Sequence, residues 1–185
     1  MKELPQVVED FAQLMERRGI TYALMGGIAV RVYGIPRPTY DVDIMASVPR
    51  DALDGLYDAV EQAGYTVPET YRSGLLDEVA GMPLVKFRLY LDDHGVDVDL
   101  FLAETAYQRE LLRRRRREAI NDVSAWLASP EDLILLKLIA GRPRDYADIA
   151  DIRFVQGQLD EDYLRQWARE LGVQDALERV LGEPM

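Results

Sequence analysis

The sequence predicts an α/β fold with a helical C-terminal segment. Three observations lead to this prediction. An apolar run at 21–25 passes through a glycine pair straight into a helix-periodic segment, alternating apolar and polar residues mark strands at 83–91 and 96–102, and apolar residues recur at helical spacing from 129 onward. We therefore expect an α/β unit at 1–128 and a helical unit at 129–185.

Composition restricts the class of protein. The 185 residues include 48% hydrophobic and 30% charged residues, enough for one ordinary core and a polar surface. No apolar run approaches the ~20 residues of a membrane span, and the N-terminus has no apolar signal region. We expect a cytoplasmic protein with no membrane partner.

Charge and rare residues exclude several chemistries. A net charge of −11 argues against a broad basic surface, so no DNA partner is predicted, although a local groove for RNA stays open. The chain has no cysteine and one histidine, His94, which disfavours zinc clusters and catalytic triads. Any chemistry must use carboxylates, lysine, arginine or a metal.

Glycine and proline bound the elements of the first half, because glycine ends a helix and proline opens one or keeps a connector extended. Pro36 and Pro38 are expected to keep the connector before Asp41 extended, and Pro49 is expected to open a helix. The predicted elements are helices at 4–17, 26–34 and 49–64, strands at 21–25, 41–45, 83–91 and 96–102, strand and loop at 65–72, a segment of either kind at 75–79, and a hairpin turn at 92–95.

The second half is mainly helical. Ser129 is a suitable N-cap, Pro130 fits the first helical position, and acids follow in the first turn. The predicted elements are helices at 106–117, 129–141, 146–155, 160–171 and 173–181, with a strand at 123–127.

Gly26 and Gly27 are candidates for anion binding. Glycine tolerates positive φ and has no Cβ, so backbone N–H groups can approach a ligand closely. The helix N-terminus behind the pair favours phosphate. The alternative is a plain strand-to-helix connector.

Asp41 and Asp43 are candidates for metal binding. Side chains alternate along a strand, so both carboxylates project from one face while Val42 and Ile44 enter the core. Carboxylates about 7 Å apart repel unless a cation lies between them, and oxygen ligands suit magnesium. The alternative is a solvated strand face.

The order of these two motifs resembles the signature of the nucleotidyltransferase superfamily related to DNA polymerase beta. Its members have a glycine turn followed by Asp-hydrophobic-Asp-hydrophobic, as at Gly26-Gly27 and at Asp41 to Ile44. The resemblance extends over 22–152. It implies a short mixed sheet flanked by helices, with the C-terminal helices covering a nucleotide cleft.

Flanking residues resemble the small prokaryotic branch, which includes abortive-infection toxin-type and aminoglycoside-modifying members. The residues concerned are Tyr33-Gly34 and the segment Arg37-x-Thr39-x-Asp41. The resemblance assigns Arg37 and Thr39 to nucleotide binding.

The family has a third carboxylate on a later strand. The predicted strand at 96–102 offers Asp97 and Asp99 on one face. Asp99 is our choice, because the segment from Leu100 to Tyr107 resembles the family more closely when Asp99 is the ligand. Asp97 is the second choice, and a solvated hairpin face is the alternative for both.

Lys137 and Asp148 resemble a second family block, in which a lysine and a later aspartate face the nucleotide. The alternatives are a lysine that extends to solvent from an apolar helix, and a helix cap in the case of Asp145. The five arginines at 113–117 are interpreted as a solvated helix end with surface ion pairs, or as an RNA- or phosphate-directed patch.

The implied activity is transfer of a nucleoside monophosphate from a nucleoside triphosphate, ATP among them, to an acceptor. Asp41, Asp43 and Asp99 would hold magnesium or manganese, and the acceptor could be tRNA, protein or a small molecule. The rival interpretations are an inactive, antitoxin-like binding partner and a magnesium-dependent phosphatase or nuclease.

Overall fold

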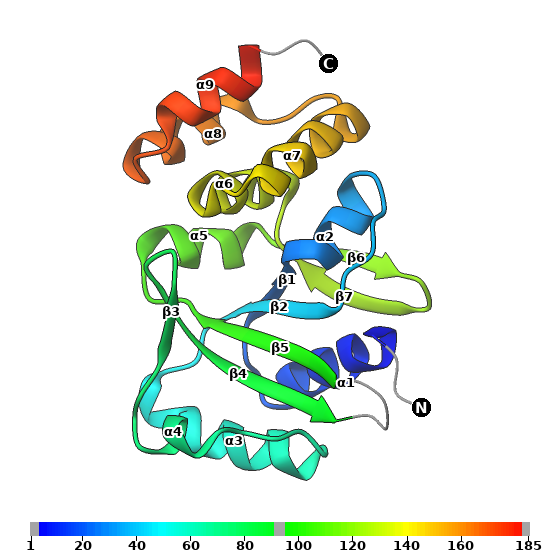
Figure 1. Ribbon diagram of the computed structural model, residues 1–185, viewed down its shortest axis with the longest axis vertical. Helices are drawn as coiled ribbons and strands as arrows, with labels where there is room; N and C mark the ends of the chain where they lie inside the picture. The colour runs from blue at the N-terminus through cyan, green and yellow to red at the C-terminus, as the bar shows by residue number, and fades with distance from the viewer. Residues whose placement is uncertain (1–3, 91–94, 183–185) are drawn as a thin grey trace.

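The computed structural model describes residues 4–90 and 95–182. Within these residues, seven strands form one mixed sheet in the order β3-β4-β5-β2-β1-β7-β6 (Figure 1). The strands are β1 Tyr22–Met25, β2 Asp41–Ala46, β3 Asp77–Val79, β4 Met82–Tyr90, β5 Gly95–Leu102, β6 Arg116–Ile120 and β7 Val123–Leu127. β2 runs parallel to β5, and β1 runs parallel to β7 and antiparallel to β2.

Helices flank the sheet, which confirms the predicted fold class. They are α1 Leu4–Arg17, α2 Gly26–Tyr33, α3 Leu53–Gln62, α4 Glu69–Arg72, α5 Ala106–Arg114, α6 Pro130–Ala140, α7 Pro143–Gln156, α8 Glu161–Glu170 and α9 Gln174–Gly182, with a short 3-10 turn at Arg50–Ala52 before α3. None of the described helices is long and apolar enough to cross a membrane.

Aromatic packing fixes α1 and α3 to one face of the sheet. The ring of Phe87 on β4 stacks on Phe11 of α1 at 5.8 Å and meets Tyr57 of α3 edge-on at 6.2 Å. Because side chains alternate along β4, Lys86 and Arg88 project from the opposite face. That opposite face also carries the predicted acids.

The C-terminal helices form a stack on that second side. Figure 1 shows α2 and α5 next to the sheet, with α6 and α7 above them and α8 and α9 outermost. α6 begins as predicted: Ser129 accepts a hydrogen bond from the backbone N–H of Asp132, and Gly141 ends the helix at φ +62°. The predicted boundary at residue 128 falls in the connection between β7 and α6.

Two predicted segments differ in the structure. The helix predicted to reach residue 117 ends at Arg114, and Arg116–Ile120 forms strand β6, which pairs antiparallel with β7. The sequence there has no alternation of apolar and polar residues, and the strand forms because it pairs with β7. The segment at 65–72, predicted as strand and loop, has one isolated β-bridge between Thr66 and Arg88 and then the helical turn α4. The predicted turn at 92–95 lies outside the described residues except for Gly95, which begins β5.

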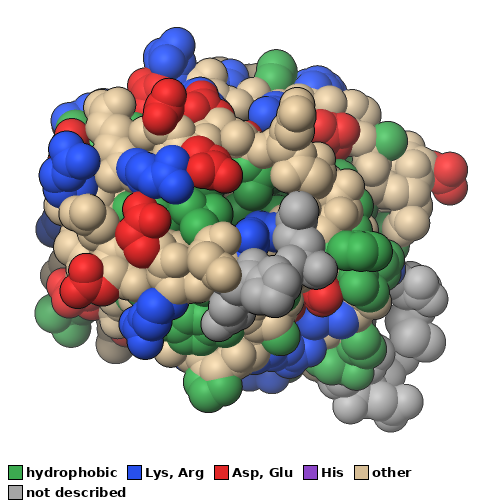
Figure 2. Space-filling model, turned by 90° about the horizontal axis from the view of Figure 1, so that it is seen from above, with side chains coloured by type: hydrophobic (Ala, Val, Ile, Leu, Met, Phe, Trp, Pro, Cys, Tyr) green, Lys and Arg blue, Asp and Glu red, His purple; other side chains and the backbone are tan. Residues whose placement is uncertain are grey.

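Each of the five arginines at 113–117 has an acidic or aromatic partner within the protein. The contacts are Arg113 with Glu110 (2.6 Å), Arg114 with Glu131 (3.4 Å) and the Tyr163 ring, Arg115 with the Trp126 ring, Arg116 with Glu131 (3.6 Å), and Arg117 with Glu16 (2.8 Å). Figure 2 shows acidic and basic side chains interspersed on the face seen from above.

Candidate active site

The three predicted carboxylates lie on the two central neighbouring strands. In the parallel register of β2 and β5, Asp43 is opposite Asp99 and Asp41 is opposite Asp97. The Asp99 side chain is 20% exposed and the Asp97 side chain 50%. The structure therefore brings Asp99 next to Asp43 in the more enclosed part of the site, and places Asp97 nearer its rim.

The glycine pair and the acids belong to one site. A Cβ at Gly26 would lie 1.8 Å from Oδ2 of Asp43, and a Cβ at Gly27 would lie 2.3 Å from Oγ1 of Thr39. Gly26 also has φ +61°. Only glycine permits this approach. Met25, the N-cap residue of α2, makes no side-chain hydrogen bond to the first turn, so this helix N-terminus has no side-chain cap.

Thr39 connects the two motifs. Its hydroxyl donates a hydrogen bond to Oδ1 of Asp41 at 2.8 Å, while the same oxygen lies over Gly27. The glycine turn thus contacts the acid motif at two points, Gly26 at Asp43 and Gly27 at Thr39, which is bonded to Asp41.

Charge repulsion is concentrated on Asp43. Burial and then the nearby carboxylates of Asp41 and Asp99 raise the pKa of Asp43 to about 7, against opposing effects of Arg142 and Lys137. Burial also raises the pKa of Asp99, although a hydrogen bond from Lys86 opposes the shift. The site therefore favours the binding of positive charge.

Lys86 is a site residue that the sequence reading missed. Its Nζ lies 3.0 Å from Oδ2 of Asp99, across the β4–β5 pair. Antiparallel pairing of Tyr90 with Gly95 places Lys86 opposite Asp99 and Arg88 opposite Asp97. Counting outward from the hairpin turn would have found both pairs.

A buried ionic network lies beside the acids. Lys137 is 5% exposed, and its Nζ bonds Asp148 and lies 3.1 Å from Oδ1 of Asp145. Arg37 makes two hydrogen bonds to Asp148, of 2.8 and 2.9 Å. Arg142 donates from Nε to Asp145 at 2.8 Å. The network joins the connector before β2 to the helices α6 and α7.

The network explains how these charges are accommodated inside the protein. Burial alone would raise the pKa of Asp148, but hydrogen bonds from Arg37 and Lys137 outweigh it and lower that pKa. Asp145 shows the same balance, with its pKa lowered by Arg142 and Lys137. Lys137 does not extend to solvent, and both it and Arg37 are bound to carboxylates of this chain.

The donor set fits a divalent cation in its chemistry. Carboxylate oxygens on adjacent strands are ligands that magnesium prefers. The raised pKa of Asp43 reflects burial and nearby negative charge, which a bound cation would neutralise. Within residues 4–90 and 95–182, however, no three acidic or histidine side chains are already arranged to hold a metal. Asp41 is bonded to Thr39 and Asp99 to Lys86 instead.

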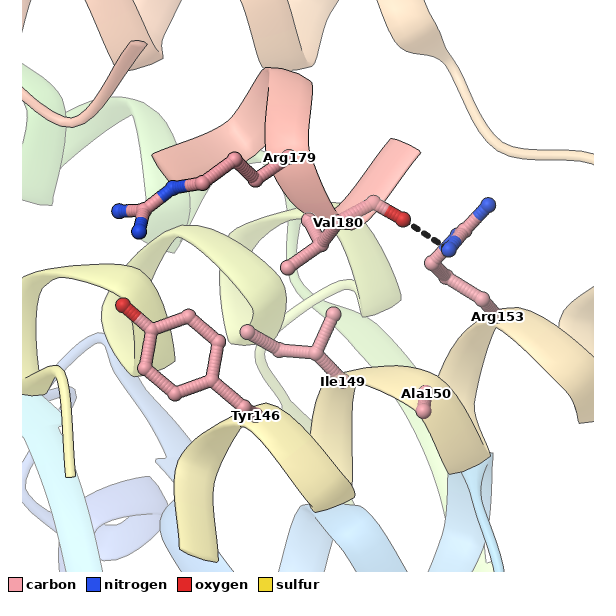
Figure 3. A pocket seen from close by; sticks show the side chains of 6 residues that line it. All are labelled: Tyr146, Ile149, Ala150, Arg153, Arg179 and Val180. Carbon is pink, nitrogen blue, oxygen red and sulfur yellow. Dashed lines mark hydrogen bonds between the residues drawn. The ribbon is translucent and has the colours of Figure 1, made fainter. Parts of the chain in front are cut away.

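A separate cavity of about 290 Å³ lies between α7 and α9 (Figure 3). It is lined by Tyr146, Ile149, Ala150, Arg153, Arg179 and Val180, none of which is a predicted site residue. Arg153 bonds the backbone carbonyl of Val180 across it. This cavity contributes nothing to the acid site.

Comparison with known proteins gives two kinds of similarity. Residues 97–179 match a family described as nucleotidyltransferase of unknown function (DUF6036). An antigenic nucleotidyltransferase-like protein from Paracoccidioides brasiliensis is 25% identical, with a TM-score of 0.53 over 81% of this chain and 73% of its own. No curated protein matches the sequence.

A second solved structure shares the fold over nearly the whole chain. The antibiotic-resistance factor ANT(2'')-Ia has a TM-score of 0.56 and 15% identity, with 94% of each chain covered. A crystal structure of ANT(2'')-Ia contains adenylyl-2''-tobramycin and has a TM-score of 0.53 at 15% identity, with 95% of each chain covered. The chain is thus similar to nucleotidyltransferases in sequence over residues 97–179, and similar in fold to nucleotidyltransferase-like proteins along most of its length.

Proposed function

We propose that this protein transfers a nucleoside monophosphate from a nucleoside triphosphate to an acceptor hydroxyl. A bond forms between the acceptor oxygen and the α-phosphorus, the bond to the bridging oxygen of the β-phosphate breaks, and pyrophosphate leaves. The observation that carries the proposal is the contact of Asp43 with Gly26, which joins an uncapped helix N-terminus to a carboxylate cluster.

Each residue of the site has a part in this proposal. The backbone N–H groups at Gly26 and Gly27 bind phosphate oxygens, Thr39 orients Asp41, and the network around Asp148 fixes Arg37 beside them. Magnesium or manganese, held by Asp41, Asp43 and Asp99, would supply charge neutralisation and activation of the acceptor. The helices after residue 128 would cover one side of the nucleotide.

The acceptor is proposed only by chemical class, as a hydroxyl on a small molecule, RNA or protein. The similar fold of ANT(2'')-Ia, whose crystal structure contains an adenylylated aminoglycoside, makes a small molecule the first class to test. ATP is the first nucleotide to test for the same reason.

A nucleoside triphosphate with magnesium is expected to raise the melting temperature of the protein. Phosphates and cation bind one site and neutralise its repulsion, so the pair should stabilise more than either component alone. A thermal melt with each of the four common triphosphates at millimolar concentration, with and without magnesium, measures this. The absence of a shift with every triphosphate would contradict the proposal.

Asp99→Asn is expected to remove nearly all turnover, whereas Asp97→Asn should reduce it only about 10- to 100-fold. Asp99 lies opposite Asp43 and is the less exposed of the two, while Asp97 is paired with Arg88 at 3.4 Å. Initial rates of pyrophosphate release measure which variant loses more turnover. Melting temperatures of the two variants show whether either loss comes from unfolding. The reverse ranking would transfer the metal-binding role to Asp97.

A further inference from the structure

The turn between α6 and α7 lies against the connector that leads into β2. Gly141 ends α6 and Pro143 begins α7, so Arg142 between them is the N-cap residue of α7. The neighbouring Arg144 reaches the backbone carbonyl of Pro38 at 3.5 Å, one residue before Thr39. The turn is therefore next to the segment that carries the contact with Gly27.

The other cations beside the acids already have partners within the protein. Lys137 is buried between Asp145 and Asp148, and Arg37 uses two of its nitrogens on Asp148. Arg142 differs, because its side chain is 72% exposed although Asp145 holds both its backbone N–H and one edge of its guanidinium. Nε and Nη2 both reach Asp145, at 2.8 and 3.3 Å, and within the described part of the chain Nη1 has no hydrogen-bonding partner.

Asp145 holds Arg142 in a defined orientation. Its carboxylate accepts hydrogen bonds from the backbone N–H of Arg142 at 3.1 Å and from the guanidinium of the same residue. Lys137 fixes that carboxylate from the other side at 3.1 Å. An arginine held in this way loses little conformational entropy when it binds a ligand.

Electrostatics agree with this geometry. The charge of Arg142 lowers the pKa of Asp43, and the carboxylates of Asp43 and Asp41 in turn raise the pKa of Arg142, after the larger effect of Asp145. The geometric placement comes from the turn itself, which meets Pro38 through Arg144, and from the 72% exposure of the Arg142 side chain.

We infer that Arg142 is the residue that binds the terminal phosphates of the nucleotide, with Asp145 as the residue that positions it. Gly26 and Gly27 offer only neutral N–H donors, so an exposed guanidinium supplies the charge that a triphosphate end requires. The inference rests on the proposed function, and it names the side chain that distinguishes a triphosphate from a monophosphate. It also gives Lys137 the role of supporting Asp145 rather than touching the ligand.

The test is titration calorimetry of the full chain with a nucleoside triphosphate, diphosphate and monophosphate of one base, each with magnesium. Arg142→Met should weaken triphosphate binding about 10- to 100-fold, the scale of a charge-assisted hydrogen bond, and leave monophosphate binding within about twofold. Arg142→Lys should recover part of the loss. Arg169→Met, which removes an exposed arginine of α8, is the matched control and should bind as wild type.

Three outcomes would overturn the inference. Wild-type affinity of Arg142→Met for triphosphate would show that the guanidinium does not touch it. An equal loss for monophosphate and triphosphate, or an equal loss in Arg169→Met, would indicate a general effect of removing a positive charge. If the wild-type protein binds no triphosphate, the proposed function fails as well, which separates that result from a failure of Arg142 alone.

Discussion

Replacing Asp43 by asparagine is expected to reduce nucleotidyl transfer by about 10³-fold or more and to leave the metal-free protein at least as stable as wild type. Asparagine keeps the shape of the side chain but removes the central charge of the site. The backbone of Asp43 pairs within the sheet, but among the described residues its carboxylate accepts no hydrogen bond, so no donor loses its partner in the variant. Turnover and urea unfolding of the same preparations measure both effects.

The stability effect has a defined pH dependence. The pKa of Asp43 is raised from 3.8 to about 7, so the folded protein holds this proton more tightly than the unfolded chain. Its contribution to the free energy of unfolding therefore falls as pH rises from 3.8 to about 7, and is level above. At pH ~8 with a chelator, Asp43→Asn should be more stable by on the order of 2–4 kcal/mol.

Asp122→Asn provides the control, because it neutralises an exposed acid in the β6–β7 turn. Its stability should follow wild type at pH ~5 and at pH ~8 within about 0.5 kcal/mol. A large loss of stability in Asp43→Asn at the higher pH would mean that this carboxylate supports the fold, and would weaken the metal-site interpretation.

Lys137→Met is expected to destabilise the protein by about 3–5 kcal/mol, because it removes the cation from between two buried carboxylates. Arg37 and Arg142 would remain on the outer sides of Asp148 and Asp145, yet the space between the carboxylates would have no charge to balance them. Urea unfolding at neutral pH measures the loss. The loss should shrink as pH falls, since lowered carboxylate pKa values stabilise the fold only while the groups are ionised.

Lys86→Met is the matched control for this lysine. It removes a half-exposed lysine paired with Asp99 in the same sheet, and exposed pairs contribute about 0–1 kcal/mol. Equal, small losses in both variants would contradict a supporting role for Lys137. Unchanged stability with weakened triphosphate binding would instead favour the family-based prediction that Lys137 touches the nucleotide.

Local patterns predicted most of the fold. Alternation located β4 and β5 and assigned the faces of their side chains, and the cap at Ser129 located the start of α6 within a residue. β6 was missed because a run of arginines has no alternation, and its strand conformation depends on pairing with β7.

The first motif of the site was also predictable, because glycines and acids with fixed spacing are local signals. The network around Lys137 was not, since Arg37 and Asp148 are 111 residues apart in sequence and meet only through packing of α7 against α2. The sequence did not indicate a binding role for Arg142, because the orientation of its side chain depends on Asp145 three residues later. Lys86 lay within reach of sequence reasoning, through the register of its hairpin.

The most direct test of the account is a transfer assay with α-labelled ATP, magnesium and a cell extract, run in parallel with wild type and Asp43→Asn. We expect label from the α-phosphate to enter an RNA, protein or small-molecule fraction with wild type only, together with release of unlabelled pyrophosphate. Hydrolysis to free labelled nucleotide without transfer, or equal labelling by the Asp43→Asn variant, would contradict a nucleotidyltransferase site at these acids.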